Sequence, residues 1–414
     1  MTFAIVNIGQ LVTLAGPARP RVGEEMRELG LLQDAVLLVE EGHIAAVGTY
    51  AELCSQISPG AVVLDAGGRC VTPGFVDAHT HLVFAGNRAE EFERRVAGAT
   101  YQQIAAAGGG ILRTVTLTRT ASEDELLSEA RLHRDWMLRG GTTTIEAKSG
   151  YGLDHATELR MLRVIARLEA EGPANIVPTL LAAHTVPKEF AGRRDDYVRW
   201  IISELIPDVA GQKLAKYCDA FCDEHAFTVD ETRQVFCAAK RHGLGLRIHA
   251  EQFQPDSGAS LAAELSAATA DHLEMVTRET LEQLKNAGVQ PVLLPGSVFA
   301  LGRSNYPPAR QMIEMGLGVV LATDFNPGSS PIASMPFVFS LACLFMGMSP
   351  AEALSAGTVN AAWSLGLGET IGTLETGKRA DFLIHEFEDY RELAYYMAAP
   401  ARPRAYIAGR EATA

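Results

Sequence analysis

The sequence predicts an α/β protein: a (β/α)8 TIM-like barrel with a small β-sandwich domain built from both chain termini. Apolar strands alternate with amphipathic helices through residues 73–371, and eight such units fit a barrel, whose typical size is about 250 residues before insertions. Short β-like runs separated by glycines fill residues 1–72, and runs of the same style return in residues 372–414. We therefore expect residues 1–72 and 372–414 to form one composite sandwich beside the barrel.

Eight runs in the barrel region have the length and apolar character of strands. They cover residues 75–81, 142–148, 176–184, 219–224, 244–251, 268–274, 289–295 and 318–324. Helical periodicity falls between them, most clearly in residues 122–139, 155–171, 229–243 and 277–288. Several of these segments open with Ser, Thr or Asp, the residues that cap helix N-termini, which supports the helical interpretation.

Composition narrows the classes of function. The 414 residues are 47% hydrophobic and 21% charged, which is typical of a globular protein with a large core. No apolar run reaches about 18 residues, and the N-terminus resembles a first strand rather than a signal peptide, so we expect a cytoplasmic protein. The net charge of −14 argues against nucleic acid or an anionic membrane as a partner, and an anionic substrate would need a local cation.

The six cysteines are scattered without framework spacing, which predicts free thiols in a reducing compartment. Cys218, Cys222 and His225 could suggest a structural zinc site by composition. No fourth ligand is nearby, so buried apolar cysteines are the favoured interpretation.

Chemically capable side chains gather where the predicted strands end. The C-terminal ends of the strands form the active site of such barrels, and histidines packed at random would not concentrate there. The strand-end residues are His79, His81, Lys148, His184, Glu224, His249, His272 and Asp324.

The segment from Pro73 to His81, Pro-Gly-Phe-Val-Asp-Ala-His-Thr-His, indicates a metal site. Residues two apart on a strand point to the same face, so His79 and His81 project together. A catalytic metal needs about three or four protein ligands. His249 is the natural third ligand and Asp324 the fourth, a set that suits zinc and also iron.

These motifs also carry a family resemblance. The pieces VTPGFVDAHTHLVFAGNRAEEFERR, EAKSGYGL, AAHTVPKEF, IHAEQF, ADHLE and ATDFNPGSSP resemble the amidohydrolase superfamily and, within it, the imidazolonepropionase family. The resemblance covers nearly the whole chain. It implies metal-dependent hydrolysis of the ring C–N amide bond of 4-imidazolone-5-propanoate to N-formimidoyl-L-glutamate, in histidine degradation. It also implies one Zn²⁺ or Fe³⁺ per subunit and a homodimer.

The resemblance assigns roles to single residues. The metal ligands would be His79, His81, His249 and Asp324, and the substrate contacts Arg88, Tyr151, His184, Gln252, Asn326, Gly328 and Ser329. Position 252 holds Glu in some members of the family. A glutamine cannot act as a general base, which leaves Asp324 and His272 to handle protons, with His184 helping to stabilise an oxyanion.

Each substrate-side residue also has a simpler explanation. The Arg88 guanidinium could pair a substrate carboxylate bidentately, or form a surface salt bridge with Glu90, Glu91 or Glu93. Tyr151 could simply pack. The Asn-Pro-Gly-Ser-Ser run at residues 326–330 offers donors for a small polar ligand, but it is also ordinary turn chemistry.

Three other functions stay open at this point. A related amidohydrolase could deaminate a cyclic amidine or base, and a non-catalytic member of the fold would be expected to have lost ligands. A dinuclear site bridged by a carboxylated Lys148 is the third. The apolar run at residues 336–348 could lie in the barrel shell or at a dimer face.

Overall fold

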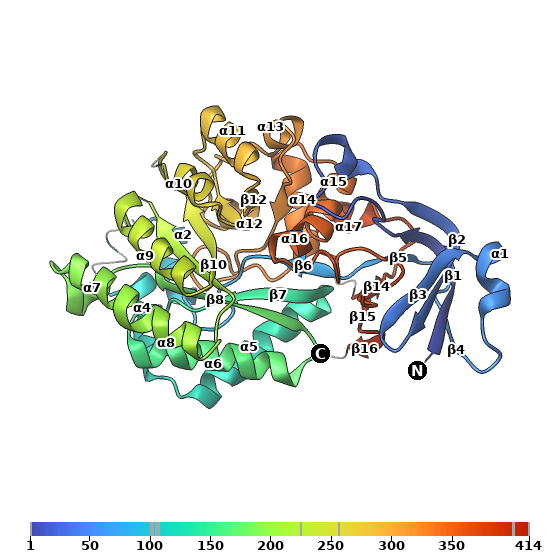
Figure 1. Ribbon diagram of the computed structural model, residues 1–414, viewed down its shortest axis with the longest axis horizontal. Coiled ribbons are helices and arrows are strands. Elements are labelled where there is room, and N and C mark those ends of the chain that lie inside the picture. Colours follow the sequence, from blue (N-terminus) through green and yellow to red (C-terminus); the bar gives the residue numbers. More distant parts are fainter. Residues whose placement is uncertain are drawn as a thin grey trace.

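Two separate sheets organise the chain, as the computed structural model shows (Figure 1). The structure describes residues 2–99, 103, 108–223, 226–255, 257–399 and 402–412. Glu224 and His225 lie outside these residues, so the strand end predicted at residue 224 and the histidine of the alternative zinc site are not described.

The first sheet is the predicted barrel, with eight parallel strands that follow one another in sequence order. They are β6 (Phe75–Asp77), β7 (Thr142–Lys148), β8 (Asn175–Ala183), β9 (Tyr217–Cys222), β10 (Gly245–Ala250), β11 (Thr269–His272), β12 (Gln290–Leu293) and β13 (Val320–Leu321). All eight predicted strands are confirmed, but the first and the last three, β6, β11, β12 and β13, are markedly shorter than predicted.

Helices alternate with these strands along the chain, and most lie around the sheet (Figure 1). They are α2 (Ala89–Val96), α4 (Ile111–Thr120), α5 (Glu123–Arg139), α6 (His155–Glu171), α7 (Arg194–Trp200), the π-helix η4 (Ile201–Leu205), α8 (Ile206–Gly211), α9 (Val229–Arg241), α10 (Gly258–Leu265), α11 (Arg278–Ala287), α12 (Pro295–Ala300), α13 (Ala309–Glu314), α14 (Met335–Phe345), α15 (Pro350–Ala356) and α16 (Val359–Ser364). By contrast, α16 shares an apolar cluster with Val76 and Val320. The predicted caps form: Ser122 accepts from the Glu125 amide and Thr228 from the Glu231 amide.

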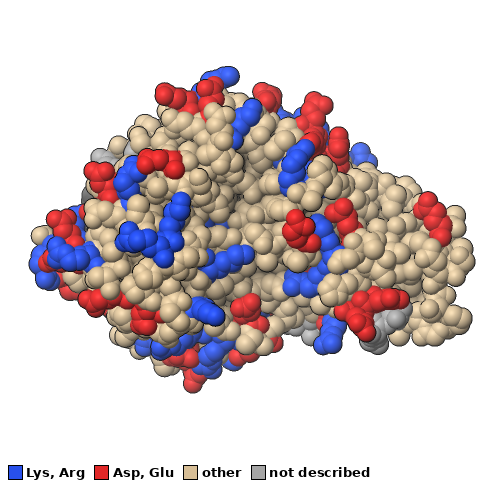
Figure 2. All heavy atoms as spheres, in the orientation of Figure 1, with Lys and Arg blue, Asp and Glu red and all other residues tan. Residues whose placement is uncertain are grey.

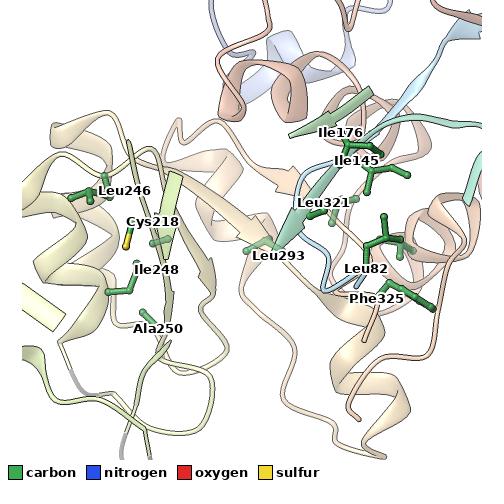
Figure 3. Packing of buried hydrophobic residues seen from close by; sticks show 14 of the residues in the cluster. Leu82, Ile145, Ile176, Cys218, Leu246, Ile248, Ala250, Leu293, Leu321 and Phe325 are labelled. Carbon is green, nitrogen blue, oxygen red and sulfur yellow. The ribbon is translucent and has the colours of Figure 1, made fainter. Parts of the chain in front are cut away.

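Alternation along the strands divides apolar from polar side chains. On β10, Leu246, Ile248 and Ala250 join the main apolar core (Figure 3). The residues between them, Arg247 and His249, therefore project to the opposite face, inside the barrel. The same alternation on neighbouring strands gives the barrel a charged interior at its centre.

The barrel closes through loop backbone rather than through a ladder of β6 and β13. The Asp324 amide donates to the His79 carbonyl over 3.1 Å, and the His81 amide donates to the Phe325 carbonyl over 2.8 Å. The predicted first strand extended to His81, but the regular strand stops at Asp77. Beyond Asp77, the Thr80 hydroxyl donates to the Glu146 backbone carbonyl over 2.7 Å. This contact turns the segment away from the path of a regular strand.

The second sheet combines both ends of the chain, as predicted. Its order is β16-β15-β14-β5-β1-β2-β3, with β4 also paired to β1. The strands are β1 (Thr2–Val12), β2 (Leu31–Glu40), β3 (His43–Thr49), β4 (Val62–Asp65), β5 (Cys70–Pro73), β14 (Phe382–Ile384), β15 (Arg404–Ile407) and β16 (Arg410–Ala412). This unit has its own apolar core, in which Phe3 and Ile5 meet Phe382 and Tyr406. Domain boundaries at residues 72 and 371 stay a prediction.

Short elements complete the connections. They are η1 (Gly23–Arg27), α1 (Tyr50–Leu53), η2 (Cys54–Gln56), η3 (Lys188–Phe190) and α17 (Glu392–Tyr395). Acidic and basic side chains are interspersed over the face drawn in Figure 2. Within the described ranges, no helix is long and apolar enough to cross a bilayer. Within the described residues no cysteine forms a disulfide, and Cys218 and Cys222 are buried, as expected.

The stacked pair of Phe382 and Tyr406 joins the core of the terminal sheet, with ring centroids 4.6 Å apart. Phe382 is fully buried, so Phe382→Ala should lower the free energy of unfolding by about 3–5 kcal/mol through lost burial and a cavity. Urea denaturation measures this. Val63→Ala, on the exposed face of β4, should change stability by less than about 0.5 kcal/mol. Equal effects of the two changes would contradict this account of the core.

Candidate active site

Three imidazoles and one carboxylate converge at the seam of the barrel. The Nε2 atoms of His79 and His81 lie 3.5 and 3.4 Å from Asp324 Oδ1, and His249 Nε2 lies 3.5 Å from His81 Nε2. Four ligands placed tetrahedrally at about 2.05 Å from one ion are about 3.3 Å apart. His79, His81 and Asp324 have ligand atoms within 4.8 Å of one another, which fits one ion, and His249, the fourth residue predicted from the sequence, lies next to His81. All four residues are buried.

Two buried carboxylates fix the orientation of these imidazoles. His79 Nδ1 lies 2.6 Å from Asp271 Oδ2, and His249 Nδ1 lies 3.1 Å from Asp219 Oδ1. Each Nδ1–H thereby donates outward and leaves the Nε2 lone pair facing the centre. Nε2 of His79 is buried and makes no hydrogen bond within the described residues, and burial holds the pKa of His79 well below its usual value. A neutral imidazole with an unused lone pair fits a metal ligand.

Two buried cations stand behind the carboxylates. Lys148 Nζ lies 2.8 Å from both Glu146 and Asp219, and these carboxylates raise its pKa although burial opposes them. An ammonium held in this way is not the neutral amine that carboxylation needs, so the geometry disfavours the dinuclear alternative. Arg247 Nη2 donates to the Ala78 carbonyl over 2.8 Å and lies 3.6 Å from Asp271.

His272, predicted to handle protons, lies beside the same centre. It joins His79 and His249 in a second group that could hold a metal ion, with ligand atoms within 4.8 Å of one another. Its Nδ1 is 3.4 Å from Glu274 Oε1. Burial lowers the pKa of His272, but the Glu274 and Asp324 charges outweigh it and raise that pKa. His272 and Asp324 both have positive φ, at 81° and 54°, a strained backbone of the kind that clusters at functional sites.

Tyr151 and His184 form one wall next to His81. Their rings lie 5.3 Å apart, and His184 stacks on His81 with centroids 5.2 Å apart. His184 Nδ1 donates to the Gly150 carbonyl over 2.9 Å, and burial holds its pKa well below the usual value. The ring is therefore neutral and presents Nε2 as an acceptor. In this tautomer Nε2 can accept a hydrogen bond from a substrate N–H. It has no proton to donate to an oxyanion, the role expected from the sequence.

Arg88 lies close enough to this wall for its charge to act on Tyr151. Its Nε donates to Thr114 Oγ1 over 3.0 Å, and its charge acts on Tyr151 against the rise in pKa that burial causes there. The salt-bridge alternative is not what the structure shows, because Glu90 pairs with Arg113 and Glu91 accepts from the Gly110 amide. Across the described ranges, no carboxylate forms an ion pair with Arg88.

The 326–330 loop is shaped by Asn326. Its Oδ1 accepts from the Gly328 and Ser329 amides over 2.8 and 2.7 Å, and its Nδ2 donates to the Asp324 carbonyl over 2.6 Å. The side chain predicted to touch substrate is thus engaged in its own loop. Gly328 lies against Arg88, because a Cβ built there would be 2.3 Å from Arg88 Nη1.

Gln252 and Glu274 line a small cavity of about 40 Å³, together with Ser297. Glu274 Oε2 and Ser297 Oγ are buried there without a hydrogen-bond partner in the described part of the chain. Glu274 therefore provides a carboxylate next to His272. Position 252, where some members of the family have Glu, holds the amide of Gln252.

Sequence reasoning found the strand ends but missed the residues that orient them. Asp219, Arg247, Asp271, Glu274 and Thr114 were not singled out. Part of the signal was present: Arg247 stands two residues before His249 and therefore shares its face of the strand. Thr114 lies on a helix of another unit, and nothing in the local sequence connects it to Arg88.

Comparison with known proteins agrees with this geometry. The model of the amidohydrolase family matches residues 70–400. The chain is 56% identical to the imidazolonepropionase of Solibacter usitatus, over 98% of this chain and 97% of that one. It belongs to the imidazolonepropionase family. Family members from Symbiobacterium thermophilum and Streptococcus pyogenes are 45% and 41% identical, over 95% and 98% of this chain and 93% and 96% of theirs. Like other amidohydrolases, this imidazolonepropionase family member is a hydrolase.

Solved structures share the fold at low identity. An adenosine deaminase from Xanthomonas campestris superposes with a TM-score of 0.72 at 19% identity, over 99% of this chain and 92% of that one. A 5-methylcytosine deaminase from Klebsiella pneumoniae gives 0.75 at 16% identity, over 99% and 97%. At this low identity the two structures support only the fold of the imidazolonepropionase family member, the barrel and the terminal sheet.

The contact between Asp271 and His79 leads to a testable expectation. In Asp271→Asn a neutral amide replaces the carboxylate that accepts from His79 Nδ1, so metal affinity should fall by about 10–100-fold. Competition with a chromophoric chelator measures this. Asp195→Asn, at an exposed position on α7, is the control and should bind metal normally. An unchanged affinity of a folded Asp271→Asn protein would show that the contact does not orient a ligand.

Proposed function

We propose that the chain hydrolyses the ring C–N amide bond of 4-imidazolone-5-propanoate to N-formimidoyl-L-glutamate. The observation that carries this proposal is the placement of Arg88. Its guanidinium has no carboxylate partner in the described ranges and lies beside Tyr151, whose ring is 5.9 Å from that of the proposed ligand His81. A substrate with a flexible carboxylate and a reactive ring would reach both at once.

The metal ligands in this proposal are His79, His81, His249 and Asp324, which hold one ion per subunit. The donor set suits Zn²⁺ or Fe³⁺. When bound, such an ion would lower the pKa of a coordinated water to about 7 and polarise a carbonyl group.

Two residues manage the proton of the attacking water. Asp324 reaches the centre through Oδ1, and His272 lies on the other side, backed by Glu274. Asp324 orients the water, and neutral His272 accepts its proton. The same proton then passes to the ring nitrogen as the C–N bond breaks, so the oxygen ends in the new carboxylate and the hydrogen on the released nitrogen.

The remaining residues orient the substrate. Arg88 and Ser329 bind the propionate, while Tyr151 contacts the ring. His184 Nε2 accepts a ring N–H, in keeping with its tautomer. Asn326 acts from behind by holding the Gly328 and Ser329 amides. Gln252 lies at the far edge of the ring, where its amide can donate or accept but cannot act as a base.

We further propose a cytoplasmic homodimer. Leu344 and Phe345, at the end of α14 in the apolar run singled out from the sequence, are more than half exposed in the single chain. Exposed apolar side chains of this size are candidates for a subunit contact. Light scattering of the purified protein measures the native mass directly.

Turnover assays test the proposed function. The purified protein should hydrolyse 4-imidazolone-5-propanoate and leave guanine and cytosine unchanged, while elemental analysis should find one zinc or iron per chain. Chelator treatment and Asp324→Asn should each abolish turnover, because both remove the activated water. Deamination of guanine or cytosine in place of ring opening would refute the proposal, and near-normal kcat in metal-loaded Asp324→Asn would refute the role of Asp324.

The His272–Glu274 pair predicts a pH dependence. Proton acceptance needs neutral His272, so activity should be lost as pH falls through its raised pKa. Glu274→Gln removes a charge that raises this pKa, and the acidic limb of the profile of kcat/KM against pH should move to lower pH. Glu279→Gln, exposed on α11, should leave the limb in place. A limb that stays fixed in Glu274→Gln would remove His272 from the proton path.

A further inference from the structure

The anchoring of Arg88 suggests how this site selects its substrate. Thr114 lies on α4, is 2% exposed, and accepts a hydrogen bond from Arg88 Nε over 3.0 Å. Resting on the function proposed above, we infer that Thr114 is a positioning residue: it holds the Arg88 guanidinium against Gly328, and this clamp sets the preference for imidazolones whose side chain ends in a carboxylate.

The hydrogen bond decides which edge of the guanidinium is free. A guanidinium can bind a carboxylate through Nε and one terminal nitrogen, or through both terminal nitrogens. Because Thr114 occupies Nε, Arg88 presents Nη1 and Nη2. Two parallel hydrogen bonds from that edge fix a carboxylate in position and in plane.

Gly328 is the second part of the clamp because it has no side chain and so leaves room for the guanidinium, not because it needs a special backbone conformation. A Cβ at this position would lie 2.3 Å from Arg88 Nη1 and 2.9 Å from Cζ. The Gly328 amide is already held by Asn326 Oδ1 over 2.8 Å, so the loop cannot easily withdraw. Any side chain at position 328 would therefore displace the guanidinium.

Fixing the side chain before the substrate arrives has a thermodynamic consequence. A free arginine side chain loses rotamer freedom, and with it entropy, when it is immobilised. Here part of that loss occurs on folding, because Thr114 is buried on a helix. The neighbouring acids are also engaged, Glu90 with Arg113 and Glu91 with the Gly110 amide, so they do not compete for Arg88. Preorganisation should therefore appear as affinity for the carboxylate, not as a faster chemical step.

Three variants on one helix test this inference. Thr114→Val removes the acceptor with little change in shape, Thr114→Ser keeps a hydroxyl, and Thr116→Val is the control on the exposed side of α4. For imidazolone propanoate, Thr114→Val should raise KM about tenfold with little change in kcat, the expected size for one hydrogen bond to a charged group. Thr114→Ser should recover most of the affinity, and Thr116→Val should match the wild type.

A second substrate separates positioning from a loss of structure. We would compare kcat/KM for the propanoate with kcat/KM for an imidazolone whose side chain ends in a methyl group. Thr114→Val should lower this ratio about tenfold, and Gly328→Ala should lower it in the same direction. An equal loss on both substrates, or an unchanged ratio, would overturn the inference.

Calorimetry distinguishes failure of this inference from failure of the proposed function. Imidazole propanoate should bind the metal-loaded wild type, and Thr114→Val should weaken that binding about tenfold relative to binding of imidazole alone. If the wild type shows no turnover, the proposed function fails, and this comparison still decides the role of Thr114. Equal binding by the wild type and Thr114→Val would refute that role even in an active enzyme.

Discussion

The site depends on how the barrel is closed. The segments that follow β6 and β13 exchange backbone hydrogen bonds, from the Asp324 amide to the His79 carbonyl and from the His81 amide to the Phe325 carbonyl. The bonds that complete the barrel therefore also place a carboxylate between two imidazoles that are far away in the sequence. Asp324 has a positive φ of 54°, which is costly for a residue with a side chain, and the seam and the surrounding loop hold it there.

Charge balance explains why this interior calls for a cation. Five carboxylates and two basic side chains are buried around the histidines: Glu146, Asp219, Asp271, Glu274 and Asp324 against Lys148 and Arg247. Burying an ion costs several kcal/mol unless it is paired, and burial lowers the pKa of His79 and His81, which disfavours their charged forms. Burial raises the pKa of Asp271 although Arg247 and Lys148 oppose it, as expected for a centre with excess negative charge. A divalent ion would balance two of the carboxylates.

The sequence predicted the parts of this protein that repeat or stand at strand ends. Strand–helix alternation gave the barrel, and β7 has the predicted bounds, Thr142–Lys148, where three β-branched threonines followed by Ile145 favour an extended chain. The length of β6 could not be predicted, since Thr80 and Glu146 redirect the chain through a tertiary contact. For the same reason the roles of Asp271 and Thr114 could not be read locally: each acts through a partner from another unit of the barrel.

The 324–330 loop joins the two halves of the site. Asp324 reaches the histidines, Gly328 lies against Arg88, and the Asn326 side chain bonds both to the Asp324 carbonyl and to the Gly328 amide. A short segment with an internal network therefore sets the distance between Asp324 and Arg88. Reacting groups held at a fixed distance need little further ordering before the bond changes, so in the proposed function Asn326 would contribute to catalysis without having to touch the substrate.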